Sequence, residues 1–282
     1  MAPNRHLLQK AARRVGIHPT TQVLVLGHQK TGTSAIASLL ALMTGASYSQ
    51  DPFYQVDRGS AVALREVTTQ PEKFAAIAAQ NAGLFRSQIV KDPDFIYFLP
   101  QLKSAYPGAA QVFVTRRPED MIRSIIGRLG LPADALEQPA TALQKHLPNQ
   151  HWLAVLGGFN VEESNNGEHT ESPLAHSAAW NLLHRWIECN RIYLANRNEM
   201  HIIRYEDFCQ SKASTLRSLT ALLGLRARHD ISSSLDRQFQ PSGRSRAGKL
   251  SLDDFPSAAA LVPTVLEQLD AMGYDTPPAA KS

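Results

Sequence analysis

The chain has 282 residues, 43% of them hydrophobic, with 29 basic and 25 acidic residues and a formal net charge of +4. This composition favours one globular domain, and the positive excess is too small to indicate a protein that wraps nucleic acid. The two cysteines, Cys189 and Cys209, lack the paired spacing of a disulfide framework or a zinc site, and we expect both to be buried in a reducing compartment.

The N-terminal residues 1–16 carry several charges but no apolar core of the kind that marks a secretory signal. No stretch approaches the roughly 18 consecutive apolar residues that span a bilayer. We therefore expect a cytoplasmic protein without a transmembrane segment. The basic N-terminus keeps peripheral membrane association open as an alternative, and the oligomeric state is open as well.

A buried strand followed by a tight loop and a helix is predicted near the N-terminus. Residues 22–26 (QVLVL) form a short apolar run that ends at Gly27, and residues 34–43 (SAIASLLALM) repeat apolar positions at helical spacing. Between them lies the glycine-containing turn HQKTGT. Strand, loop and helix in this order are typical of phosphate-binding folds.

Further strands and helices alternate along the rest of the chain. We expect strands at 88–90, 111–115 and 201–204, and helices at 118–129, 176–197, 213–223 and 262–272. The pattern predicts a three-layer α/β fold in which helices flank a central parallel sheet, with polar clusters meeting at the carboxyl edge of the strands. Residues 130–173 have weak periodicity and are interpreted as an insertion or lid in a single domain spanning 1–282.

The loop at residues 27–34 has the features of an anion site. Successive backbone N–H groups and a helix N-terminus favour a phosphate, and Thr33 and Ser34 add hydroxyl donors. The pattern is P-loop-like, but Thr33 stands where a Walker A loop has its lysine. The lysine is instead Lys30, two residues before Gly32, which argues against an ATPase or GTPase.

The loop resembles the 5′-phosphosulfate loop of sulfotransferases that use 3′-phosphoadenosine-5′-phosphosulfate (PAPS). That family has an arginine at the end of a later strand and a serine eight residues on, and Arg116 and Ser124 match this spacing. Arginine offers a planar fork suited to a phosphate. Arg117 is a rival for the same role, although the eight-residue spacing favours Arg116.

This resemblance implies transfer of a sulfuryl group from PAPS to a hydroxyl or amine, without a metal. It assigns Lys30 the main electrostatic role. The residues that it places at the co-substrate are Gln29, Lys30, Thr31, Gly32, Thr33, Ser34, Arg116 and Ser124, with Arg244, Gly248 and Lys249 in a late basic loop over the 3′-phosphate. The segment Arg204–Asp207 resembles the family's Tyr-Glu-Asp segment, whose acids we expect to brace the site.

The general base of the reaction is left open among three residues. One branch of the family has a histidine two residues after a strand-end lysine, but here Pro93 occupies that place after Lys91. Another branch has a carboxylate about twenty residues beyond the loop lysine. Asp51 fits this spacing and is the first candidate, Asp92 is the second, and His28 is the third.

Two other functions compete with a sulfotransferase. One is a P-loop kinase or nucleotide hydrolase, and the other is a non-catalytic nucleotide-binding scaffold on the same fold. For an enzyme, the acceptor is expected to be a small molecule, a glycan or a lipid, and no nucleic-acid partner is expected. Aromatic residues such as Trp180 and Trp186 either line an acceptor pocket or belong to the core.

Overall fold

The computed structural model describes residues 21–57, 67, 70–157, 176–239 and 248–275. The chain divides into two compact units: unit 1 comprises Met1–Arg116 and Asn198–Ser242, and unit 2 comprises Arg117–Arg197 and Gly243–Ser282. The phosphate-loop segment belongs to unit 1, whereas the 130–173 segment belongs to unit 2. The interpretation of one domain with an insertion or lid stays a prediction.

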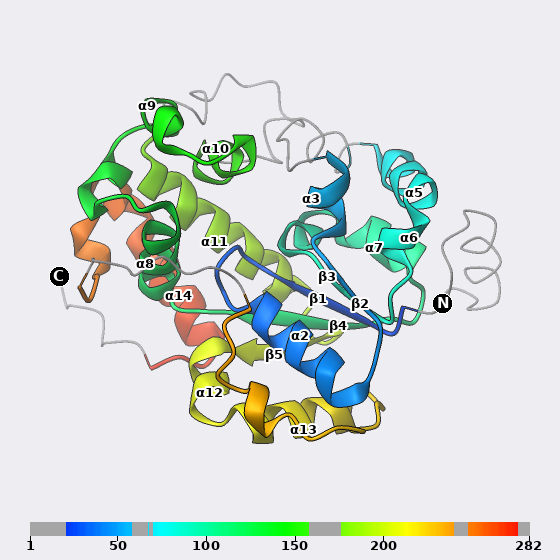
Figure 1. The fold of residues 1–282 in the computed structure, drawn as a ribbon. Coiled ribbons are helices and arrows are strands. Elements are labelled where there is room, and N and C mark those ends of the chain that lie inside the picture. Colours follow the sequence, from blue (N-terminus) through cyan, green and yellow to red (C-terminus); the bar gives the residue numbers. More distant parts are fainter. Residues whose placement is uncertain (1–20, 58–66, 68–69, 158–175, 240–247, 276–282) are drawn as a thin grey trace. The chain divides into compact units, whose positions relative to one another are not determined.

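Unit 1 is built on a parallel sheet that has five strands within the described residues (Figure 1). The strands are β1 (Val23–Gly27), β2 (Tyr48–Gln50), β3 (Ile89–Lys91), β4 (Ala110–Thr115) and β5 (Met200–Arg204). Their order in the sheet is β2-β3-β1-β4-β5, and every neighbouring pair is parallel. All the carboxyl ends therefore lie along one edge, where ligands of such sheets bind.

The helices of unit 1 follow the strands in chain order. They are α2 (Thr33–Thr44), α3 (Pro52–Asp57), α5 (Pro71–Gln80), α6 (Ala82–Phe85), the 3-10 helix η1 (Pro93–Phe98), α7 (Leu99–Ala105), α12 (Tyr205–Gln210) and α13 (Lys212–Leu222). The α/β class with a parallel sheet flanked by helices is confirmed. The four predicted strands are confirmed to within one residue at each end, and β2 was not predicted.

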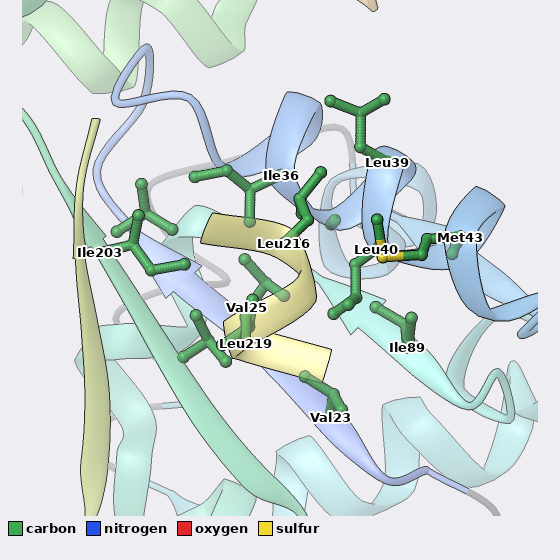
Figure 2. Close-up of a cluster of buried hydrophobic side chains, with 14 of the residues drawn as sticks. Val23, Val25, Ile36, Leu39, Leu40, Met43, Ile89, Ile203, Leu216 and Leu219 are labelled. Atoms are coloured by element: carbon green, nitrogen blue, oxygen red, sulfur yellow. The ribbon is translucent and has the colours of Figure 1, made fainter. Parts of the chain in front are cut away.

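One hydrophobic core joins the sheet to helices α2 and α13. Figure 2 shows side chains from these helices meeting apolar side chains of β1, β3 and β5. Val23 and Val25 belong to this core, whereas Leu24 and Leu26 alternate to the other face and are just as inaccessible to solvent. Both faces of β1 are thus covered, which explains why its sequence is a continuous apolar run.

The prediction that both cysteines are buried is wrong for Cys209. Cys189 is buried on a helix of unit 2, but Cys209 is exposed on α12. The preceding residue, Phe208, is 1% exposed and belongs to the core. In this short amphipathic helix Phe208 takes the inward position, and its neighbour in sequence faces solvent.

Unit 2 is helical within the described residues. Its elements are α8 (Pro118–Leu129), η2 (Ala133–Glu137), α9 (Ala140–Leu143), η3 (Gln144–His146), α10 (Gln150–Gly157), α11 (Ala178–Ala195), η7 (Leu252–Asp254), η8 (Pro256–Leu261) and α14 (Val262–Ala271). The described part of the 130–173 segment forms short helices, and α10 is tied to α11 by a hydrogen bond from Asn181 Nδ2 to Leu156 O. No helix among the described residues is long and apolar enough to cross a membrane.

Candidate functional site

The loop between β1 and α2 is a tight turn closed by Thr31. The backbone N–H and the Oγ1 of Thr31 both donate to the carbonyl of His28, at 3.3 and 2.8 Å. Lys30 has φ 67° and Gly32 has φ 100°, so two residues of the loop lie in the left-handed region. Backbone of this kind turns successive N–H groups toward a common point, which is the geometry of an anion-binding nest.

Two glycines allow the loop to approach its neighbours closely. A Cβ at Gly27 would lie 2.4 Å from the carbonyl oxygen of Val114 on β4. A Cβ at Gly32 would lie 2.1 Å from Cδ2 of Tyr205. The backbone at Gly32 therefore packs directly against an aromatic ring, and no other residue type fits there without displacement.

Helix α2 presents its N-terminus at the end of this loop. Gly32 is its N-cap and supplies no side-chain hydrogen bond to the first turn. The first N–H groups of a helix have no intrahelical acceptor, and they carry the positive end of the helix dipole. Thr33 and Ser34 lie in this first turn and are 3% and 6% exposed. Loop and helix end together form a cradle whose donors suit an anion.

Arg116, which follows β4, lies beside the loop. Its Nη1 donates to the carbonyl of Lys30 at 3.3 Å, and its guanidinium carbon lies 4.7 Å from the centre of the Tyr205 ring. Burial raises the pKa of the Tyr205 phenol above its ordinary value, so this ring is neutral at physiological pH. The Arg116 guanidinium and the Tyr205 ring thus lie together beside the backbone of Lys30, where β1, β4 and β5 end.

An ion pair occupies the ends of β2 and β3. Lys91 Nζ lies 2.6 Å from Asp51 Oδ1, with side chains 3% and 21% exposed. Asp51 also has φ 50°, and its backbone N–H donates to the carbonyl of Lys91 at 2.6 Å. Asp51 therefore retains access to solvent while a buried cation orients its carboxylate.

Asp92 has a structural task. It is 1% exposed, its Oδ1 accepts the N–H of Asp94 at 3.1 Å, and its Oδ2 accepts the N–H of Phe53 at 3.0 Å. These bonds cap η1 and fix the start of α3. Burial, reinforced by the charges of Asp51 and Asp94, raises the pKa of Asp92 well above its ordinary value. Because it is almost fully buried, Asp92 is poorly placed to meet a substrate.

The other predicted site residues are placed as follows. His28 is 2% exposed, with Nδ1 3.0 Å from the carbonyl of Gln29. In unit 2, Ser124 is half-buried on α8, Gly248 and Lys249 are exposed, and Arg244 lies outside the described residues. Arg117, the rival of Arg116, donates from Nη2 to the carbonyl of Asp275 at 2.8 Å and lies over the ring of Tyr274.

Sequence reasoning missed two contacts of the loop. The first is the packing of Tyr205 on Gly32. In the same segment Asp207 pairs with Arg204 at 2.6 Å, and the expected bracing of the site by the acids stays a prediction. The second is a bond from Gln29 Nε2 to Asp94 Oδ1 at 2.7 Å. Asp94 carries no motif that pointed to the loop, and in the segment of Tyr205 only the acids were expected to contribute to the site.

Comparison with known proteins finds likeness in structure only. No family model matches the chain, and no curated protein matches it in sequence. The sulfotransferase STF1 from Mycobacterium tuberculosis aligns with a TM-score of 0.52 at 14% identity, covering 94% of this chain and 81% of that one. The sulfotransferase STF9 from Mycobacterium avium aligns with a TM-score of 0.52 at 12% identity, covering 96% and 82%. The chain therefore shares its fold with solved sulfotransferases.

Proposed function

We propose that this protein is a sulfotransferase that moves a sulfuryl group from PAPS to a hydroxyl or amine acceptor. The observation that carries the proposal is the setting of Lys30: it lies inside the loop in a left-handed conformation, before Gly32, and Arg116 donates to its carbonyl. A lysine in this place aims at a different atom from that reached by a Walker A lysine. The fold shared with two sulfotransferases supports the same conclusion.

The loop and the first turn of α2 would hold the phosphosulfate of PAPS. Gln29, Lys30 and Gly32 would contribute backbone groups, and Thr33 and Ser34 would add hydroxyl donors. The hydroxyl proton of Thr31 is already donated to His28, so Thr31 shapes the turn. The loop's donor set fits the group, because backbone N–H groups and a helix N-terminus are what an anion requires.

Lys30 would act by charge stabilisation. Sulfuryl transfer resembles phosphoryl transfer, in which catalysis is mainly positioning and the neutralisation of charge on the leaving oxygen. The S–O bond to the 5′-phosphate breaks while a new S–O or S–N bond forms to the acceptor, and the ammonium meets the negative charge that grows on the departing phosphate. Arg116 would bind the 3′-phosphate, and the roles of Ser124, Arg244, Gly248 and Lys249 at the co-substrate stay predictions from the sequence.

Asp51 is the proposed general base. It combines partial exposure with a fixed orientation against Lys91, whereas Asp92 and His28 are almost fully buried. It would accept the proton of the acceptor hydroxyl as the nucleophile attacks sulfur. A positioned base of this kind contributes a factor of about 10²–10⁴ to the rate.

Replacing Asp51 and Asp92 in turn separates the base from the structural acid. Asp51→Asn should lower kcat by a factor of about 10²–10⁴ and remove the acid limb of the pH–rate profile. Asp92→Asn should keep that limb. Because the pKa of Asp92 is raised in the folded state, the protonated side chain stabilises the protein, and this stabilisation is lost as pH rises through that pKa. Asn does not ionise, so the melting temperature of Asp92→Asn should lack this part of the decline with rising pH. Loss of the acid limb in Asp92→Asn alone would reverse the assignment.

Arg116 should determine the preference for a 3′-phosphate. Arg116→Ala should weaken binding of adenosine 3′,5′-bisphosphate by about 10- to 100-fold, because a charged hydrogen bond contributes about 1.5–3 kcal/mol. The affinity for AMP, which has no 3′-phosphate, should change far less. Titration calorimetry measures both affinities, and Arg117→Ala is the control because that side chain binds Asp275. An equal loss for both nucleotides would refute the role.

The proposed function is tested by sulfated products. An extract is incubated with PAPS and either the wild-type protein or Lys30→Ala, and an untargeted comparison then identifies sulfated compounds. We expect at least one sulfated small molecule, glycan or lipid that forms only with the wild type. Binding of adenosine 3′,5′-bisphosphate without any such product would instead favour a nucleotide-binding scaffold.

A further inference from the structure

A buried hydrogen bond ties the phosphate loop to the neighbouring strand end. Gln29 Nε2 donates to Asp94 Oδ1 at 2.7 Å across 65 positions of sequence. Gln29 is 6% exposed and Asp94 is 2% exposed. Such a bond to an ionised acceptor is stronger than a neutral one, and low exposure strengthens it further.

The loop needs external support at the residue that follows Gln29. Lys30 has φ 67°, a left-handed conformation that costs a residue with a Cβ about 1–2 kcal/mol. Such a conformation persists only where the surroundings determine it. After Lys30, the hydroxyl of Thr31 closes the turn by donating to the carbonyl of His28, and Arg116 donates to the carbonyl of Lys30. On the other side the side chain of Gln29 is anchored to Asp94.

The position of Asp94 is fixed by hydrogen bonds that connect it to the sheet. It lies in the first turn of η1, and its backbone N–H donates to Asp92 Oδ1 at 3.1 Å. Asp92 follows β3 directly, and its own N–H donates to the carbonyl of Val25 on β1 at 3.3 Å. The carboxylate of Asp94 is therefore fixed to the same sheet whose central strand leads into the loop.

We infer that Asp94 is a positioning residue that acts through Gln29 to hold the left-handed turn at Lys30. Asp94 is not assigned a contact with substrate. It fixes the peptide before Lys30, and this peptide determines the direction in which the Lys30 side chain extends from the backbone. This inference rests on the proposed function for its effect on catalysis. Its effect on the loop itself is independent of any reaction.

Hydrogen exchange of the loop tests the anchor without relying on activity. In Asp94→Ala, amides of residues 28–32 should exchange about tenfold faster, since the loss of a charged hydrogen bond corresponds to a factor of this order. Asp94→Asn keeps an acceptor oxygen and should restore most of the protection. Gln29→Met removes the donor from the other side, and it should match Asp94→Ala.

Turnover then shows whether the anchor acts on Lys30. Asp94→Ala should lower kcat by about tenfold or more, but it should add nothing in a Lys30→Ala background, because residues that act as a unit are not additive. The control is Thr21→Val, which removes a partly buried hydrogen bond (Thr21 Oγ1 to the carbonyl of Ser87, 2.9 Å) before the amino end of β1. It should change neither loop exchange nor kcat.

Each outcome decides the inference. Unchanged loop exchange in both Asp94→Ala and Gln29→Met overturns it, and so does a full additional loss of kcat when Asp94→Ala is combined with Lys30→Ala. A third outcome is that even the wild type transfers no sulfuryl group, while loop exchange rises in Asp94→Ala and Gln29→Met but not in Thr21→Val. In that case the positioning role of Asp94 is supported and the proposed function is refuted.

Discussion

Lys30→Ala is expected to lower kcat by a factor of about 10²–10³, the cost of removing one preorganised group that stabilises transition-state charge. The affinity for adenosine 3′,5′-bisphosphate should fall much less, because in the proposed mode of binding the 5′-phosphate is held in the ground state by backbone N–H groups of the loop and the α2 N-terminus. Release of this product from PAPS in the presence of an acceptor measures the first quantity, and calorimetry measures the second.

The matched control for Lys30 is Lys103→Ala. Lys103 belongs to the same unit and pairs with Glu199 at 3.0 Å in an exposed setting, so its loss should leave kcat unchanged. Lys30→Arg keeps the charge but replaces a compact ammonium with a planar fork, and it should recover only part of the rate. Near-normal turnover in Lys30→Ala would reject the electrostatic role assigned to this side chain.

Gly32→Ala is expected to cause a large loss of stability in the loop, although it adds only one methyl group. The new Cβ would lie 2.1 Å from the Tyr205 ring, and the backbone has φ 100°. The left-handed conformation costs about 1–2 kcal/mol, and the steric overlap costs about 1–3 kcal/mol more. Chemical denaturation should show the loss of stability, and nucleotide binding should be lost with it.

Gly224→Ala separates the two costs. Gly224 also has positive φ, 65°, but no atom lies within 4 Å of its would-be Cβ, so this variant should show only the backbone cost. Combining Gly32→Ala with Tyr205→Ala removes the opposing ring, and the double variant should lose less stability than the sum of the single ones. If Gly32→Ala were no worse than Gly224→Ala, the close packing of Tyr205 on the loop would be contradicted.

The strands of this fold could be predicted where burial on both faces leaves a continuous apolar run, as in β1 and β4. The strand β2 was missed because Tyr48–Gln50 is short and polar and lies at the edge of the sheet. This omission hid the setting of Asp51, which follows a strand parallel to β3 and pairs with Lys91. Local pattern cannot reveal a pairing that depends on the order of strands.

Part of the candidate site was accessible from the sequence, and part was not. The loop could be recognised because strand, glycine turn and helix follow one another, and Arg116 because it ends a strand. Asp92 was a plausible base because it follows a strand end, but this position in the sequence does not report that two backbone N–H groups bind its oxygens. The sequence does not connect Asp94 with the loop, because its partner Gln29 is 65 positions away and is reached only through the packing of β3 beside β1.

The most direct test of the account is a comparison of nucleotide affinities for the wild-type protein by titration calorimetry. The central claim is that this loop and Arg116 select a nucleotide with phosphates at both the 3′ and 5′ positions. Adenosine 3′,5′-bisphosphate should bind at least about tenfold more tightly than ADP, the gain expected from one additional charged contact. Equal affinity for the two, or a preference for ATP with Mg²⁺, would contradict the account and point to a kinase or nucleotide hydrolase.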